Sequence, residues 1–379
     1  MWVFALVSGC FFMGCNAVSI IIPLRMADQS LSYSSIGGVM ASFSVGMFAI
    51  KLFIGRHSDL VGQKVYAVLA LSTAALFVLL IAFAKSTTHY IVLLGLVGVC
   101  RGAFTSINTS YTLELSKQGE QGAGFGKILG ITSLLSALGG VMAGALYKFQ
   151  QGKFAFIAVS VLLALSATFT VIFMRNPAKK NSEKLVSKGL FANMDKTVYL
   201  FCVVMFLQTF ITSPMWSTIV PMHFYKSFTY TALALGIAMS MDEFISSPVN
   251  MIGGYIADRV NVKKMICIGY VLAAIVGALM LLAGHALIFL AIFLVCSVFV
   301  TSTYISVPKA ESYFVRDTAK GFEFTLISIC ASVGDALGNV VLGRVMDAFS
   351  IKAGILMFSV TYVIIAVIVG VKLKIKTES

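Results

Sequence analysis

About twelve runs of roughly 20 apolar residues follow one another along this chain, most of them separated by very short polar segments. A helix of that length crosses the hydrocarbon of a bilayer. One such run near the N-terminus could be a signal peptide, but twelve cannot. We therefore expect an all-α integral membrane protein with transmembrane helices near residues 3–24, 34–54, 65–84, 90–112, 124–147, 154–174, 197–220, 230–253, 265–284, 287–307, 322–343 and 352–371.

The composition of the chain also requires a solvent other than water. Of its 379 residues, 59% are hydrophobic and only 11% are charged, whereas a soluble domain carries about a quarter charged residues. Hydrophobic cores stop growing near roughly 250–300 residues, so one soluble core could not bury this excess. The lipid bilayer is the expected surrounding of the chain.

The net charge of +13 is distributed in a way that indicates membrane topology and not a nucleic-acid surface. The basic residues lie at the ends of the apolar runs, and Lys and Arg favour the cytoplasmic side of a membrane. With both termini in the cytoplasm, twenty Lys and Arg fall on that side and seven on the other. We expect a monomeric multi-pass protein of a bacterial cytoplasmic membrane, with both termini cytoplasmic and no nucleic-acid partner.

No motif in the sequence indicates catalysis, a cofactor or a metal. The four histidines do not cluster, and the seven cysteines lie inside apolar runs without the spacing of metal ligands. No Gly-x-x-x-x-Gly-Lys-Ser/Thr segment, which would bind a nucleotide phosphate, occurs. The sequence therefore disfavours an enzyme and an ATP-driven pump, and we expect no metal and no cofactor.

The second half of the chain repeats the first. A charged segment that begins at Gly55 and contains Asp59 recurs at Gly254 with Asp258, and further matches lie at offsets of 197 to 199 residues. A polar, lysine-rich stretch at 175–196 separates the halves. Since each half holds six expected helices, both enter the membrane with the same orientation. We predict an N-terminal six-helix bundle at 1–174, a cytoplasmic basic linker at 175–196 and a C-terminal six-helix bundle at 197–379.

These repeated charged segments resemble the signature loops of the major facilitator superfamily, and the resemblance covers the whole chain. It implies twelve transmembrane helices in two pseudo-symmetric six-helix bundles, which rock around a central site. The first copy departs from the family pattern, because Leu60 stands where an Arg usually follows the Asp. The resemblance implies a lock on the cytoplasmic side made by Gly55, Asp59, Gly62, Lys64, Gly254, Asp258, Arg259 and Lys263.

Four ionisable residues fall near the middle of expected helices: Arg101, Asp242, Glu243 and Asp335. A charge at this depth costs at least about 2.5–3.5 kcal/mol, so each is a candidate for function. A carboxylate removed from water can load and release a proton near neutral pH, which would couple transport to a proton gradient. The alternative is that these residues form buried ion pairs between helices. Asp242 and Glu243 point about 100° apart on a helix, so we expect only one to face the cavity.

Arg101 also resembles the Arg that drug-exporting members of the family carry in the same helix, and the glycine-rich expected helix 124–147 resembles their export signature. The match is partial, since Gly102 follows Arg101 directly and the helix lacks the usual Pro. Polar residues on other helices are further candidates for the substrate cavity, or else for hydrogen bonds between helices: Asn16, Thr105, Asn108, Gln208, Asn250 and Asn339.

Together these features predict a secondary active transporter that works by alternating access. We favour proton-coupled efflux, in which protons enter as a drug-like compound or metabolite leaves. Two alternatives remain, which are a transporter of a sugar or another polar metabolite and a lipid flippase. Asn and Gln in the cavity would favour a sugar, and aromatic residues a lipophilic cation.

Overall fold

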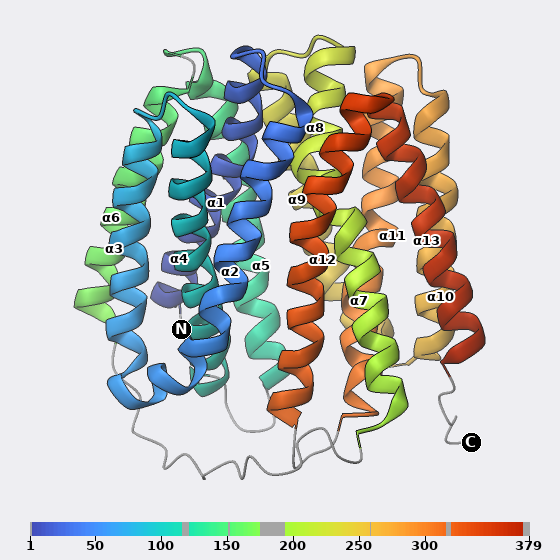
Figure 1. The fold of residues 1–379 in the computed structure, drawn as a ribbon. Helices are drawn as coiled ribbons and strands as arrows, with labels where there is room; N and C mark the ends of the chain where they lie inside the picture. Colours follow the sequence, from blue (N-terminus) through green and yellow to red (C-terminus); the bar gives the residue numbers. More distant parts are fainter. Residues whose placement is uncertain are drawn as a thin grey trace.

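The computed structural model describes residues 2–115, 121–150, 152–174, 194–257, 259–315 and 320–373, and all regular structure in them is helical (Figure 1). The first half consists of α1 (Trp2–Asp28), α2 (Tyr33–Val61), α3 (Gln63–Ile81), α4 (Thr87–Leu115), α5 (Gln121–Tyr147) and α6 (Lys153–Phe173). The second half begins with one long broken helix made of α7 (Lys196–Pro214), η1 (Met215–Ile219), α8 (Val220–Met222) and η2 (His223–Ser227). It continues with α9 (Ala232–Ala257), α10 (Val262–Leu279), the short η3 (Met280–Leu282), α11 (Ala286–Ser312), α12 (Lys320–Ala348) and α13 (Ile351–Lys372).

Eleven stretches within the described residues are long and apolar enough to cross a membrane. The remaining membrane-length helix, α9, is not among them, and it is the helix that carries the adjacent acids Asp242 and Glu243. Like the other membrane-length helices, α9 packs along other helices of the molecule, which in its case are α5 and α11. Twelve membrane-length helices are therefore present in the described residues, which confirms the predicted fold class.

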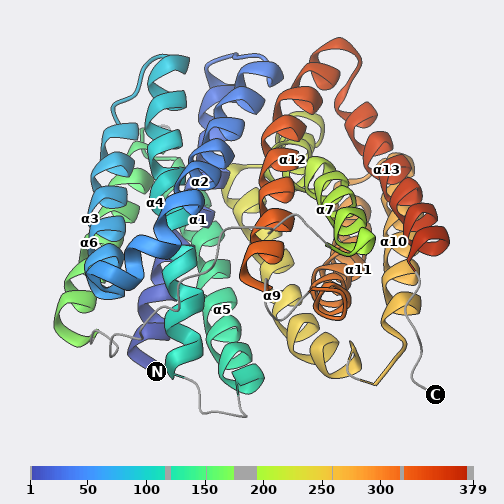
Figure 2. The same ribbon diagram turned by 60° about the horizontal axis from the view of Figure 1, so that its bottom comes forward.

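The two halves form separate bundles with matching internal contacts (Figure 2). In the first bundle α1 packs on α5, α2 on α4, and α3 on α6; in the second α7 packs on α12, α9 on α11, and α10 on α13. These are the same pairs once the six helices of each half are counted in order. Between the bundles, α5 packs on α9 and α2 on α12. The internal sequence repeat thus corresponds to a repeated packing scheme.

The helix ends differ from the expected ones where apolar runs give way to polar sequence. The charged segment expected as a turn after residue 54 continues α2 to Val61, and Gly62, with φ of 112°, is the only residue between α2 and α3. A φ in that range strains any residue with a Cβ, which explains the glycine. Helices continue beyond the hydrocarbon because their backbone bonds are satisfied internally. The surroundings of Gly55 and Gly254, the side chain of Asp59 and all of Asp258 lie outside what the structure describes.

The first membrane helix of the second bundle is interrupted by two π-helical turns. Pro214 ends α7, and the turn η1 (Met215–Ile219) follows it; Pro221 lies in α8, and the turn η2 (His223–Ser227) follows that. Proline removes a backbone donor and crowds the preceding turn, and π-turns commonly occur at such places and at functional sites. The whole unit spans Lys196–Ser227, which is longer than the expected 197–220.

We call the side of the molecule where the described chain stops at 174 and resumes at 194 the linker face, and the opposite side the far face (Figure 1). The bundles approach each other most closely toward the far face. A Cβ added to Gly37 of α2 would overlap the carbonyl oxygen of Asn339 in α12, and Gly236 of α9 faces Gly140 of α5 in the same manner. Glycine at these positions therefore allows two helix backbones to come into contact.

Two carboxylates at the far face join the bundles. Asp28, at the end of α1, accepts hydrogen bonds from the hydroxyl of Tyr147 in the same bundle and from the hydroxyl of Tyr225 in the other, both at 2.6 Å. Asp347, near the end of α12, accepts bonds from the backbone amides of Tyr33 and Ser34, both at 2.8 Å, and from the Ser34 hydroxyl. We call these two groups the far-face latches.

Candidate central cavity

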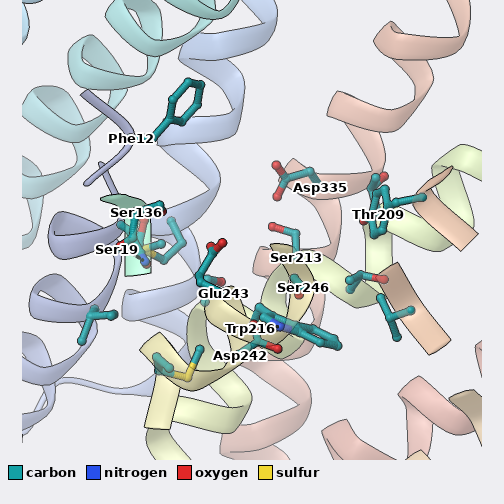
Figure 3. A pocket seen from close by; sticks show the side chains of 18 of the residues that line it. Phe12, Ser19, Ser136, Thr209, Ser213, Trp216, Asp242, Glu243, Ser246 and Asp335 are labelled. Carbon is teal, nitrogen blue, oxygen red and sulfur yellow. Dashed lines mark hydrogen bonds between the residues drawn. The ribbon is translucent and has the colours of Figure 1, made fainter. Parts of the chain in front are cut away.

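A cavity of about 700 Å³ lies between the two bundles. Its walls come from α1, α2, α4 and α5 on one side and from α7, η1, α9, α11 and α12 on the other, and Figure 3 shows part of the lining. Twelve serine and threonine side chains line it, so its surface is rich in hydroxyl groups: Ser19, Ser44, Thr132, Ser133, Ser136, Thr209, Thr212, Ser213, Ser217, Ser246, Ser297 and Thr301. The cavity is large enough for a small organic solute.

The acidic residues of the cavity all belong to the second bundle. Asp242 and Glu243 come from α9 and Asp335 comes from α12, and all three line the cavity. Figure 3 shows the three carboxylates around the same space. The expectation was that only one of the two neighbours in α9 would face the cavity. Both do so, because α9 lies along the cavity wall and the two side chains reach it from its adjacent faces.

Asp242 is held by an aromatic donor. Its exposed fraction is 5%, and its Oδ2 accepts a 2.8 Å hydrogen bond from the indole nitrogen of Trp216. Trp216 belongs to the π-turn η1 and packs against Phe293 and Phe358. The hydrogen bond from Trp216 to Asp242 connects the π-turn η1 to α9. The other carboxylate oxygen of Asp242, Oδ1, is buried and has no hydrogen-bond partner among the described residues.

The other two acids differ in how strongly they are held. Asp335 accepts a 2.9 Å hydrogen bond from Asn339, one turn further along α12, and Asn339 in turn accepts a 3.1 Å bond from Ser217. The half-buried Glu243 carboxylate makes no hydrogen bond within the part of the chain that is described. Its oxygens are therefore free to accept from a solute or to carry a proton.

Arg101 of α4 supplies positive charge on the opposite wall. Its guanidinium lies 5.2 Å from the ring centre of Phe43 and 5.9 Å from that of Phe12, which are cation–π distances. Its charge acts on Glu243 and Asp335 across the cavity. Among the described side chains none forms an ion pair with it, and the first bundle lines the cavity with no acid.

The other polar residues expected at the cavity divide into two groups. Asn16 and Asn339 line it, with Asn16 donating a 2.9 Å bond to the carbonyl of Ser136. The remaining four lie elsewhere: Thr105 donates to the carbonyl of Arg101, Asn108 accepts from Ser8, Gln208 bonds Thr303 and Tyr270 inside the second bundle, and Asn250 is a half-buried residue of α9 apart from the lining.

Sequence reasoning did not single out Trp216 or the hydroxyl residues. Thr209, Thr212, Ser213 and Trp216 recur at three- and four-residue spacing along α7 and η1, which places them on one face of a helix. That periodicity was available in the sequence as a polar stripe within an apolar run. Groups of acids, cysteines and histidines that could hold a metal ion are absent from the described residues.

Comparison with known proteins identifies the family. The family model described as Major Facilitator Superfamily matches residues 4–307 and, separately, residues 201–378. The chain belongs to the major facilitator superfamily. Members of this superfamily in which two bundles enclose a central cavity are transporters and not enzymes, so the chain is a secondary transporter of a small solute. None of the curated protein sequences matches it.

Two solved structures share this fold over nearly the entire chain. The crystal structure of the nucleoside transporter NupG is similar with a TM-score of 0.79 and 16% identity, over 99% of this chain and 99% of that one. A bacterial homolog of the human lysosomal transporter Spinster, in an inward-facing and occupied conformation, gives a TM-score of 0.80 and 13% identity, over 97% and 95% of the two chains. At such identities the similarity establishes the fold alone.

Proposed function

We propose that this superfamily member exports a small organic solute in exchange for protons. The proposal is carried by one observation, which is the wall of three carboxylates formed by Asp242, Glu243 and Asp335 at the cavity. Removal from water disfavours an ionised carboxylate, so a group of this kind can take up and release a proton near neutral pH. A proton and a solute would compete for the same oxygens. Competition of that kind produces exchange, because each leaves as the other binds.

The bundle contacts support one step of an alternating-access cycle. Between described residues, hydrogen bonds cross from one bundle to the other at the latches around Asp28 and Asp347, from Lys226 to the carbonyl of Ala27, and from Ser240 of α9 to the carbonyl of Ala137 in α5. If the linker face is cytoplasmic, as the distribution of Lys and Arg favours, this conformation receives its solute from the cytoplasm. Export then requires the latches to open after the linker face closes.

A second candidate is favoured by the hydroxyl residues of the cavity. Serine and threonine side chains donate and accept hydrogen bonds, so they suit a polar metabolite better than a lipophilic compound. Transport of such a metabolite without proton exchange is the competing function. The two candidates differ in whether solute movement changes the proton gradient.

The test uses inverted membrane vesicles that contain the full chain, an imposed proton gradient and a pH-reporting dye. Solutes from several chemical classes are added one at a time. Proton release on addition of a solute supports exchange. Solute movement measured directly, with an unchanged proton gradient, would replace exchange by uniport.

Neutral variants identify the groups that carry the proton. We expect Asp242→Asn, Glu243→Gln and Asp335→Asn to give folded proteins, with solute transport that no longer responds to a pH gradient in at least one of them. Asp195→Asn is the matched control, because Asp195 caps the start of α7 outside the cavity and Asn caps a helix equally well. A normal pH response in all three cavity variants would contradict the proposal.

A further inference from the structure

The two walls of the cavity carry opposite charge, and each wall belongs to a different bundle. We infer that the solute is a zwitterion, with an amine-type cation directed at the carboxylates of α9 and α12 and an anionic group directed at Arg101. This inference rests on the proposed function, because it takes the central cavity as the solute site. It adds the chemical class of the solute and its orientation.

The acidic wall has oxygens that lack donors. Oδ1 of Asp242 is buried without a partner among the described residues, and the Glu243 carboxylate makes no hydrogen bond there. An ammonium group carries three donors and a full positive charge, so it can serve several carboxylate oxygens at once. The indole of Trp216 borders the same space, and an aromatic ring attracts a cation that lies over its face. A neutral solute would leave these acceptors without a charged partner.

The opposite wall has donors that lack acceptors. The Arg101 guanidinium packs against Phe43 and Phe12, but within the described chain it donates no hydrogen bond. A guanidinium presents a planar set of donors that matches a carboxylate or phosphate in two parallel bonds. The first bundle offers it no acid at the cavity. A solute with an anionic group would therefore complete this side of the site.

Neither a purely cationic nor a purely anionic solute would pair with the charged residues of both cavity walls. A simple organic cation would satisfy the carboxylates but would leave Arg101 unpaired and close to a second positive charge. A simple anion would face three carboxylates, which is more negative charge than Arg101 and the nearby Lys51 of α2 can balance. A zwitterion satisfies both walls and also connects the bundles, since Arg101 belongs to α4 and the acids belong to α9 and α12. Binding could then draw the bundles together over the linker face.

The first measurement is ligand binding, by thermal stabilisation of the purified full chain in detergent. The probes are free amino acids and dipeptides as zwitterions, their methyl esters as cations, their N-acetyl derivatives as anions, and glucose and uridine as neutral compounds. We expect at least one zwitterion to stabilise the protein and to bind about tenfold or more tightly than its own ester or N-acetyl derivative, because one charge-assisted contact is lost in each. Stabilisation by neutral compounds or by esters alone overturns the inference, and so does the absence of binding by every zwitterion.

Two variants assign the charges to their walls. Arg101→Gln should remove the preference for the zwitterion over its ester, while Glu243→Gln should reduce the preference over the N-acetyl derivative. Arg101→Lys keeps the charge without the planar fork and should retain part of the first preference, even if Arg101→Gln folds poorly. Lys85→Gln is the matched control, since it removes a positive charge from an exposed loop at the far face. Unchanged preferences in both cavity variants would contradict the orientation.

The two proposals fail in different ways. If a zwitterion binds with the expected charge preferences but moves without any change in the proton gradient, exchange is wrong and the solute class stands. If proton release follows addition of esters or neutral compounds but of no zwitterion, exchange stands and the solute class is wrong.

Discussion

The hydrogen bonds of the far-face latches should stabilise the conformation in which the far face is closed, relative to conformations in which it is open. Only one of the two bonds to Asp28 crosses between the bundles, and that is the 2.6 Å bond from Tyr225. A hydrogen bond to a charged group contributes about 1.5–3 kcal/mol when buried, and solvent exposure of Asp28 reduces this to about 1 kcal/mol. Tyr225→Phe should therefore shift the equilibrium about fivefold toward conformations with an open far face.

Asp347 gives a larger expected effect. It accepts from two amides and one hydroxyl of the other bundle. Asp347 is also exposed, so with the same reduction Asp347→Ala should destabilise the closed far face by about 1–2 kcal/mol. That difference corresponds to a shift of roughly 5- to 30-fold. The two latches lie on different helix pairs, so their effects should add in the double variant.

The shift can be measured as a distance distribution between spin labels on the two bundles. Lys85 and Gly284 are suitable sites, because both are exposed far-face loop residues, one in each bundle. Tyr147→Phe is the matched control, since it removes a bond to the same carboxylate from within one bundle. The reasoning is refuted if Tyr225→Phe and Asp347→Ala leave the distance distribution unchanged, or if Tyr147→Phe has the same effect as Tyr225→Phe.

Three further variants test separate parts of the structure. Gly37→Ala should force α2 and α12 apart and lengthen the same far-face distance, whereas Gly38→Ala should not, because an added Cβ there meets no atom within 4 Å. Trp216→Phe should weaken solute binding about tenfold, since it removes the donor to the Asp242 carboxylate but keeps an aromatic ring; equal binding would contradict the role of this bond. Gln208→Leu should lower stability by about 1–3 kcal/mol, because it removes the acceptor of the buried Tyr270 hydroxyl and a donor to Thr303, and transport by the folded protein should persist. A loss of solute binding without a fall in melting temperature would instead place Gln208 at the cavity.

The sequence predicts the fold better than it predicts the cavity. Apolar runs and a repeat at one offset define twelve helices in two bundles, because the bilayer restricts a chain of this kind to a few arrangements. The same signal does not separate polar residues that face the cavity from those that join helices within a bundle. Asn108 and Gln208 satisfy the same periodic pattern as Asn16, and yet both lie in bundle interiors.

Two other features depend on contacts that no local pattern records. The π-turn that presents Trp216 follows a proline, which by itself predicts a kink and not its direction. Asp28 and Asp347 lie at the ends of helices, where the sequence alone predicts carboxylates exposed to solvent. Their hydrogen-bond partners lie 119 to 314 residues away in the chain, so only the assembled fold reveals them.

The cap that Asp347 provides to α2 has a consequence for the local dynamics of that helix. Ser32, the residue directly before the helix, accepts a hydrogen bond from the amide of Ser35, but the amides of Tyr33 and Ser34 depend on a carboxylate from the other bundle. When the far face opens, the first turn of α2 loses this capping carboxylate, and the two amides donate hydrogen bonds to water instead. The rate of hydrogen exchange at these two amides therefore reports how often the far face opens. This measurement can be made on the wild-type protein and needs no spin labels.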